Sequence, residues 1–364
     1  MPDDTASPPA HRPIFIVGAN GSGTTLLRLI LDSHEHIAIP PETGVMRLAA
    51  MHEWVPYWNL GDRWAQSLDL SETEVTARLA EFYGGLLASY ADSQGKQRWG
   101  DKTPFNVWHL DLAARMFPDL QVVGIVRHPG AVASSLRRRF RRPVKRGAKH
   151  WKRSTTQLLR ECASLGDRAV VLRYEDLVSS PEPVMRALLD WLGEPWSPAV
   201  LEHHTQGAAQ QVEGFTRTDT PIDVSHVDAW TDHLSGSALE RVAAKTGPLA
   251  RFLNYEPTRP EPVAPLSDTG LLLGTALRER QRSSTINWLK APRRPVADKP
   301  LRPPSPRRRS RRHSKPDLAD VRVRDVVRHK VIALAQRRLP DATRNKVNDI
   351  RRKNATVDRI IGPR

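Results

Sequence analysis

The sequence predicts an α/β domain with a doubly wound parallel sheet, followed by a basic and partly disordered C-terminal extension. Two observations lead to this fold class. Short apolar runs alternate with segments of helical spacing over residues 12–257, and several runs pass straight into a helix through a glycine or proline turn. Beyond residue 257 the composition shifts to Pro and Arg. A chain of 364 residues can hold one such domain and an appendage, which excludes a purely fibrous or disordered protein.

Four strand–helix units account for most of the predicted domain. Strands are expected at residues 13–18, near 99–104, at 120–126 and at 169–172. The run at 120–126 is apolar almost throughout, as is typical of a strand covered on both faces. Helices are expected after Ser22, from about Asn106 to Pro118, after Gly130, and from Pro181 to Gly193.

Two further segments complete the body of the chain. Residues 43–98 form a long insert with four clustered aromatic residues and a capping box from Ser71 to Glu74. The aromatic residues fit either core and lid packing or the walls of a pocket for an apolar or ring-bearing alcohol; they are Trp54, Tyr57, Trp58 and Trp64. A last helix is expected from Ser237 to Gly247, and the domain is expected to end near Glu256.

The net charge of +16 is placed unevenly along the chain. Residues 258–364 contain 28 Lys and Arg against 10 Asp and Glu, so this part carries +18 and the body carries −2. The expected organisation is therefore a flexible N-terminus (1–11), a domain (12–257), a Pro/Arg-rich linker (258–320) and a basic helical tail (321–364). The tail suits an anionic membrane surface, an acidic protein partner or nonspecific polyanion binding, and a solvated tail without a ligand is the simplest alternative. No specific nucleic-acid partner is expected.

Compartment and metal content are also predicted. The sequence has no run of 18 apolar residues and no cationic apolar leader, so a cytoplasmic location is expected, with peripheral membrane contact through the tail as an alternative. Cys162 is the only cysteine, which excludes an intramolecular disulfide and a cysteine-based metal cluster. The histidines show no zinc-site spacing, so no metal is expected.

The segment from Gly18 to Thr25 has the spacing of a phosphate-binding loop. Its glycines let consecutive backbone N–H groups and a helix N-terminus face one anion. In nucleotide triphosphatases the residue after the second glycine is the lysine that reaches the β- and γ-phosphates, whereas here it is Thr24. An ordinary kinase or ATPase is therefore disfavoured.

Three segments together resemble the sulfotransferases that use 3′-phosphoadenosine 5′-phosphosulfate (PAPS). They are the turn Gly21, Ser22, Gly23, Thr24, Thr25 after the first strand, Arg127 followed by Ser135 after the third, and Tyr174-Glu175-Asp176 after the last. The resemblance covers about residues 12–257 and is closest to the tyrosyl-protein and carbohydrate branch. It implies a P-loop-like fold of the sulfotransferase and nucleotide-kinase type.

The resemblance also implies how the donor is held. The turn would bind the 5′-phosphosulfate, Arg127 and Ser135 the 3′-phosphate, and Tyr174 would lie near the adenine. Physical chemistry favours this role for Arg127, because a planar guanidinium at the carboxyl end of a buried strand can grip a phosphate through two N–H groups. Two anion sites on adjacent strand–helix turns suit a 3′,5′-bisphosphorylated nucleoside better than a triphosphate.

Two more segments imply the catalytic groups. Glu42 matches the place of a glutamate that acts as base, and Lys102 matches a lysine that reaches the transferring sulfuryl group. One position departs from the family pattern: Gly21 stands where the family usually has Arg or Lys. Lys102, or a basic side chain from residues 137–153, is then expected to supply the missing charge.

The sequence therefore predicts a PAPS-dependent sulfotransferase that moves a sulfuryl group to a hydroxyl acceptor. A sugar, a lipid, a peptide tyrosine or a small metabolite all remain open as acceptors. Two alternatives stay beside this interpretation. One is a P-loop-like kinase whose lysine comes from elsewhere, and the other is a non-enzymatic anion-binding scaffold that works through its basic tail.

Overall fold

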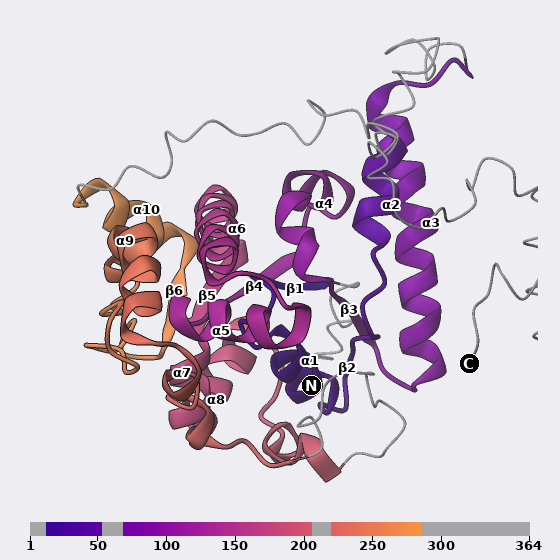
Figure 1. Cartoon of the computed structure of the whole chain (residues 1–364). Helices are drawn as coiled ribbons and strands as arrows, with labels where there is room; N and C mark the ends of the chain where they lie inside the picture. The colour runs from indigo at the N-terminus through magenta and orange to yellow at the C-terminus, as the bar shows by residue number, and fades with distance from the viewer. Residues whose placement is uncertain (1–11, 53–67, 206–219, 285–364) are drawn as a thin grey trace, which may run out of the picture. The chain divides into compact units, whose positions relative to one another are not determined.

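The computed structural model of the chain describes residues 12–52, 68–205 and 220–284 (Figure 1). Over these residues the chain forms a six-stranded sheet in the order β2-β3-β1-β4-β5-β6. The first five strands run parallel and β6 pairs antiparallel with β5. The predicted α/β fold with a doubly wound, mostly parallel sheet is confirmed, with one antiparallel strand added at its edge.

The strands are β1 (Ile14–Gly18), β2 (Ile37–Ala38), β3 (Arg98–Lys102), β4 (Gln121–Val126), β5 (Ala169–Arg173) and β6 (Leu271–Leu273). The α-helices are α1 (Thr24–Asp32), α2 (Val45–His52), α3 (Glu72–Ser93), α4 (Leu110–Met116), α5 (Pro129–Phe140), α6 (Val144–Leu165), α7 (Tyr174–Ser179), α8 (Pro181–Leu192), α9 (Gly236–Phe252) and α10 (Gly274–Arg282). Short 3₁₀ turns join them: η4 (Pro104–Trp108), η5 (Gly166–Arg168), η6 (Pro198–Leu201), η7 (His203–Thr205), η9 (Val224–His226) and η10 (Thr231–His233).

The two faces of the sheet bury alternate residues of each strand. On β1, Phe15 and Val17 join a core with residues of α3, α4, α6 and α9, whereas Ile14 and Ile16 join a second core with residues of α1, α7 and α8. This period of two follows from strand geometry, and it explains why β1, β4 and β5 are apolar at nearly every position. Figure 1 shows α3 beside β2 and β3 at one end of the sheet and α10 beside β6 at the other.

Several local signals specify the helix ends. Ser71 and Glu74 form the predicted capping box at the start of α3, with Ser71 N–H donating to the Glu74 carboxylate at 2.7 Å. Pro181 begins α8, and Gly193 ends it with a φ of 79°. The start expected near Ser237 is confirmed, since α9 begins at Gly236. The end expected at Gly247 is wrong: the helix continues through Gly247 and Pro248, because the residues beyond them are buried in the core.

The fold continues past the expected end of the domain. Residues 271–282 form β6 and α10, which extend the sheet and cover α6, although the sequence suggested a linker from residue 258. A three-residue strand and a polar nine-residue helix carry too little periodicity to be recognised from sequence. The aromatic cluster of residues 54–64, the predicted N-terminal segment, the remaining linker and the tail helix lie outside the described residues. Within the described ranges, no helix is long and apolar enough to span a bilayer.

Candidate functional site

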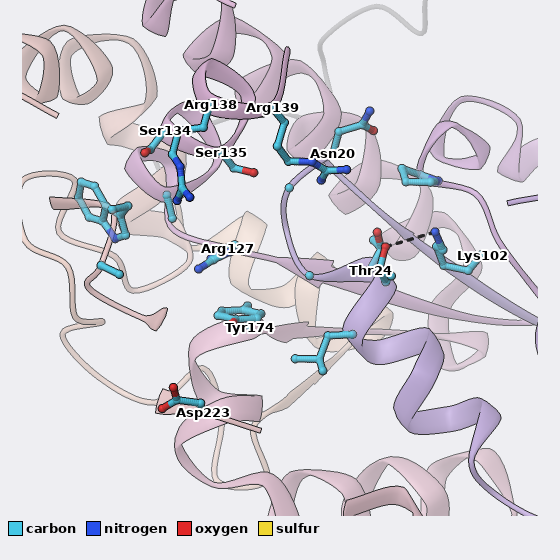
Figure 2. A pocket seen from close by; sticks show the side chains of 18 of the residues that line it. Asn20, Thr24, Lys102, Arg127, Ser134, Ser135, Arg138, Arg139, Tyr174 and Asp223 are labelled. Carbon is cyan, nitrogen blue, oxygen red and sulfur yellow. Dashed lines mark hydrogen bonds between the residues drawn. The ribbon is translucent and has the colours of Figure 1, made fainter. Parts of the chain in front are cut away.

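The carboxyl ends of four parallel strands meet at one edge of the sheet. The register places the end of β1 beside β4, Lys102 of β3 beside β1, and Arg173 of β5 beside the end of β4. A cavity of about 760 Å³ lies at this edge (Figure 2). Ligands of open α/β sheets bind at this edge, where the strand order changes direction, and the volume suits a nucleotide.

The glycine turn between β1 and α1 forms one wall of the cavity. Gly21 and Gly23 have positive φ values of 92° and 97°, a region that only glycine enters freely. Gly23 cannot carry a side chain, because its Cβ would lie 2.5 Å from the Tyr174 ring. The Asn20 N–H donates to His150 Nε2 at 3.2 Å, which ties the turn to α6. The first N–H groups of α1 therefore lie at the cavity on a fixed turn, where they can bind an anion.

Lys102 and Glu42 form an ion pair at this end of the cavity. Lys102 Nζ lies 2.7 Å from Glu42 Oε1 and 3.4 Å from Thr25 Oγ1. The lysine side chain is only 3% exposed, whereas that of Glu42 is 50% exposed. Burial lowers the pKa of the Lys102 ammonium, and its hydrogen bond to Glu42 opposes the shift. The cation is thus held inside the cavity and the carboxylate at its mouth.

The buried Asp101 holds together the two segments that carry Glu42 and Lys102. Asp101 is fully buried on β3, and its Oδ1 accepts from Thr43 Oγ1 at 3.0 Å and Thr103 Oγ1 at 3.2 Å. Its Oδ2 accepts from Asn106 Nδ2 at 2.6 Å. Because Thr43 follows Glu42 and Thr103 follows Lys102, one carboxyl group holds both segments in register. Burial raises the pKa of Asp101, and its three donors counteract that shift.

Arg127 lies at the opposite end, directly after β4. Its guanidinium stacks over the Tyr174 ring at 4.0 Å from the ring centroid. The Tyr174 side chain is mostly buried, so it gives the guanidinium a flat support that faces the cavity. Figure 2 shows Arg127 between Tyr174 below and Ser134 and Ser135 of α5 above. Such a guanidinium presents its N–H groups to a phosphate in a defined plane.

Helix α5 adds side chains along one face. Ser135, Arg138 and Arg139 are three and four residues apart, and all line the cavity. Figure 2 shows Arg139 reaching from α5 on the same side as Asn20. Partial burial lowers the pKa of Arg139 and the Glu42 carboxylate opposes the shift, so the two charges act on each other. The Cβ of a side chain at Gly21 would lie 3.1 Å from Ser135 Oγ, a tight contact, and the positive φ of Gly21 would add strain.

The structure brings nine of the ten sequence-predicted site residues to this cavity: Gly21, Gly23, Thr24, Thr25, Glu42, Lys102, Arg127, Ser135 and Tyr174. Ser22 differs, because its side chain is buried and is not part of the lining. Among the described residues its hydroxyl has no hydrogen-bond partner. Cations at both ends, a glycine turn and a serine-bearing helix fit a nucleoside with phosphate groups on both sides of its ribose.

Sequence reasoning missed several residues around the cavity. Arg138 and Arg139 were noticed only as part of a basic run, although their helical spacing from Ser135 was a usable signal. Asp101 had no such signal, because its partners come from three short segments that only the fold joins. Trp230, Ile222 and Asp223 also line the cavity from the segment before α9, where no motif stands out.

One group in the described part of the chain has metal-ligand geometry, and it lies away from the cavity. His34, His36 and Glu194 bring potential ligand atoms within 4.8 Å of one another. Glu194 already pairs with Arg98 at 2.9 Å. Both ring nitrogens of His34 have hydrogen-bond partners, the Pro195 carbonyl at 2.9 Å and the His36 N–H at 3.1 Å. The group is accounted for by contacts within the protein.

Comparison with known proteins gives a consistent result. The model of the sulfotransferase family matches residues 13–198, half of the chain. The chain is 27% identical over 262 residues to protein-tyrosine sulfotransferase 1 of Danio rerio, covering 67% of this chain and 72% of that protein. It is also 27% identical over 263 residues to protein-tyrosine sulfotransferase 2 of Gallus gallus, covering 67% and 69%.

Two solved structures are also found as similar to this chain. One is the sulfotransferase domain of the Synechococcus PCC 7002 olefin synthase, with a TM-score of 0.48, 23% identity, and coverage of 65% of this chain and 96% of that one. The other is the sulfotransferase domain from the curacin biosynthetic pathway, with a TM-score of 0.47, 23% identity, and coverage of 65% and 98%. The resemblance expected from the motifs is confirmed by the family match.

Proposed function

This chain belongs to the sulfotransferase family, and from that premise we propose that it transfers a sulfuryl group from PAPS to a hydroxyl acceptor. The observation that carries the proposal is that one cavity has anion-binding groups at both of its ends. The glycine turn and Lys102 lie at one end, and Arg127 on its Tyr174 support lies at the other. A nucleotide with a 5′-phosphosulfate and a 3′-phosphate has anionic groups to match both ends.

The transfer end supplies the groups that the reaction needs. The acceptor oxygen attacks sulfur, the bond between sulfur and the bridging phosphate oxygen breaks, and the acceptor proton goes to Glu42. Lys102 lies beside Thr25 of the turn, where its ammonium stabilises the negative charge that grows on the bridging oxygen. Glu42 is half exposed at the mouth of the cavity, where an acceptor hydroxyl can reach it from solvent.

Arg139 provides a second cation at the transfer end. Its charge and that of Glu42 act on each other, and it lines the cavity on the side of the glycine turn. We assign it the charge that a basic residue at position 21 would otherwise supply, since a side chain at Gly21 would be strained by its positive φ and crowded by Ser135. Sulfonate oxygens bound at the turn would then have Lys102 on one side and Arg139 on the other.

The acceptor site is proposed at the cavity mouth around Glu42. Pro41, Pro104 and the half-exposed Phe140 line the cavity beside the acidic and basic groups, a mixture suited to a flat hydroxyl-bearing ring. The relatives are named for protein tyrosine, so a tyrosine phenol is the first acceptor to test. Sugar, lipid and small-metabolite alcohols are tested beside it.

Two measurements test the proposal. Calorimetry or thermal shift with 3′-phosphoadenosine 5′-phosphate is expected to show binding that does not depend on magnesium and exceeds that of ATP. Labelled PAPS should then deliver its sulfuryl group to a tyrosine peptide or another alcohol from a panel. Stronger, magnesium-dependent binding of ATP would instead support a kinase. Loss of nucleotide binding on deletion of residues 285–364 would support the tail-based scaffold.

A further inference from the structure

A buried carboxylate lies beneath Arg127 and takes no part in the proposed chemistry. Glu175 on α7 is almost completely buried, and its two oxygens accept from different donors. Oε1 accepts from the His128 backbone N–H at 2.9 Å, and Oε2 accepts from the Tyr255 hydroxyl at 2.6 Å. Burial raises the pKa of Glu175, and the positive charge of Arg127 is the largest opposing influence. Enclosing a carboxylate is costly unless its partners compensate for lost hydration.

The peptide unit between Arg127 and His128 is held from both sides. Glu175 accepts the N–H of this unit, and the fully buried Trp151 of α6 donates its indole N–H to the carbonyl at 2.8 Å. Both polar atoms of one peptide are thus fixed by buried side chains from two helices on opposite faces of the sheet. The direction in which the Arg127 side chain leaves the strand follows from the plane of this peptide.

The same short segment also supports the guanidinium. Tyr174, immediately before Glu175, lies under Arg127 with its ring centroid 4.0 Å from Cζ. Asp176, immediately after, turns away and binds Arg173 through both oxygens at 2.6 and 2.8 Å. Tyr174 and Glu175 therefore support Arg127 and the peptide that follows it, whereas Asp176 binds Arg173.

We propose that Glu175 is a positioning residue for the 3′-phosphate subsite, which with Trp151 fixes the Arg127–His128 peptide and so aims the guanidinium at the phosphate. The inference rests on the proposed function, because it assumes that Arg127 binds the 3′-phosphate. It makes a specific claim: loss of Glu175 should affect recognition of the 3′-phosphate more than binding of the rest of the nucleotide.

The test is the affinity ratio between 3′-phosphoadenosine 5′-phosphate and adenosine 5′-phosphate, measured by calorimetry on the full chain. Glu175→Ala is expected to lower this preference about tenfold or more while affinity for the 5′-phosphate alone stays within about threefold, because a misaimed arginine loses charge-assisted hydrogen bonds. Glu175→Gln keeps an acceptor for the His128 N–H and is expected to retain most of the preference. Asp176→Ala is the matched control, with lower thermal stability but an unchanged ratio.

A second variant covers the case in which Glu175→Ala does not fold. Trp151→Phe keeps an aromatic ring in the core but removes the indole donor to the Arg127 carbonyl, so it is expected to lower the same ratio several-fold. An unchanged ratio in Trp151→Phe and in any folded Glu175→Ala protein would overturn the inference. So would an equal loss of affinity for both nucleotides.

Arg127→Ala in the same assay distinguishes a failure of the proposed positioning role of Glu175 from a failure of the proposed 3′-phosphate subsite. If it abolishes the preference while the Glu175 and Trp151 variants keep it, the positioning role is wrong and the proposed 3′-phosphate subsite stands. If Arg127→Ala keeps the preference as well, the 3′-phosphate subsite itself is wrong.

Discussion

The two ends of the cavity are built in different ways. At the end proposed for the 3′-phosphate, called the nucleotide end below, Arg127 lies on a buried ring and precedes a peptide bound by Glu175 and Trp151. At the transfer end, Glu42 is half exposed on a loop, and the Lys102 that it contacts is the only buried member of the pair. A rigid end suits a ligand that must be held in one pose, and an open end suits a group that must meet a varied acceptor.

This contrast predicts which measurements each end will affect. Groups at the transfer end interact with charge that develops during the reaction, so their loss should lower turnover more than nucleotide affinity. Groups at the nucleotide end contact the ligand equally before and during transfer, so their loss should weaken binding. The following variants test this division in order of expected effect.

Replacing Glu42 by Gln should give the largest change. Without a base for the acceptor proton, kcat is expected to fall about 10²- to 10⁴-fold. Affinity for 3′-phosphoadenosine 5′-phosphate should stay near that of the unmodified protein, since Glu42 lies at the cavity mouth. Turnover assays with PAPS and calorimetry with the bisphosphate measure the two quantities. Normal turnover in this variant would remove Glu42 from the mechanism.

Lys102→Ala should lower kcat about 10²- to 10³-fold, because one positioned donor to the transferring group is lost. Lys96→Ala is a matched control, because Lys96 lies just before β3, forms an ion pair with Asp32 and does not line the cavity. Steady-state kinetics on both variants separate a specific effect from a general loss of charge. Equal kinetics in the two variants would contradict the role of Lys102.

Arg127→Lys tests the nucleotide end. A point charge cannot reproduce the planar fork or the stacking on Tyr174, so the dissociation constant of the bisphosphate should rise about tenfold. The value of kcat at saturating donor should change little. A fall in kcat with unchanged affinity for the bisphosphate would place Arg127 at the transfer end and contradict the division of roles between the two ends.

Arg139→Ala should lower kcat about tenfold, less than Lys102→Ala because the arginine is partly exposed and its charge is screened. Arg137→Ala on the same turn of α5 is the control, since Arg137 does not line the cavity. Kinetics at low and high salt should show the effect of Arg139 shrinking as salt rises. If both variants behave alike, Arg139 does not supply the charge that is missing at Gly21.

Acid should destabilise the nucleotide end. Burial lowers the pKa of His128 to about 4, and its neutral ring accepts the Gly130 N–H at Nδ1, 3.1 Å away. Between pH 6.5 and 4 the unfolded chain binds more protons at this residue than the folded protein does, so stability falls as pH falls. The loss from His128 reaches about 3 kcal/mol.

Denaturant unfolding across this pH range measures the effect. His128→Asn keeps a helix-capping acceptor without the titration, so the pH dependence of its unfolding free energy should be weaker. His203, whose pKa burial also lowers to about 4, leaves part of the slope in place. An identical slope in His128→Asn would contradict this account.

The glycine turn and Arg127 show how much of the site could be predicted from sequence. Each follows directly after a buried strand, and the carboxyl ends of parallel strands meet at one edge of the sheet. The alternation of residues along each strand also predicts which side chains form the two cores. Glu42 and Lys102 needed family resemblance, because a loop carboxylate and a lysine two residues before a proline have no local pattern of their own.

Other features depended on contacts between distant segments. Glu175 meets Tyr255 across 80 residues, and Arg98 meets Glu194 across 96. Asp101 joins Thr43, 58 residues before it, to its own strand. The segment that leads to the edge strand β6 has no regular hydrophobic spacing, so the pairing of β6 with β5 could not be predicted from sequence. A pattern that spans a few residues carries no information about such partners.

By itself, the sequence determined the alternating strands, the glycine turn and the residues that end each strand, because backbone sterics and the period of burial act over a few neighbouring positions. Only the tertiary structure decided that Arg139 lines the cavity, that Asp101 joins the segments of Glu42 and Lys102, and that Glu175 and Trp151 hold one peptide. These choices rest on burial and hydrogen bonding between segments that come together only when the sheet is formed.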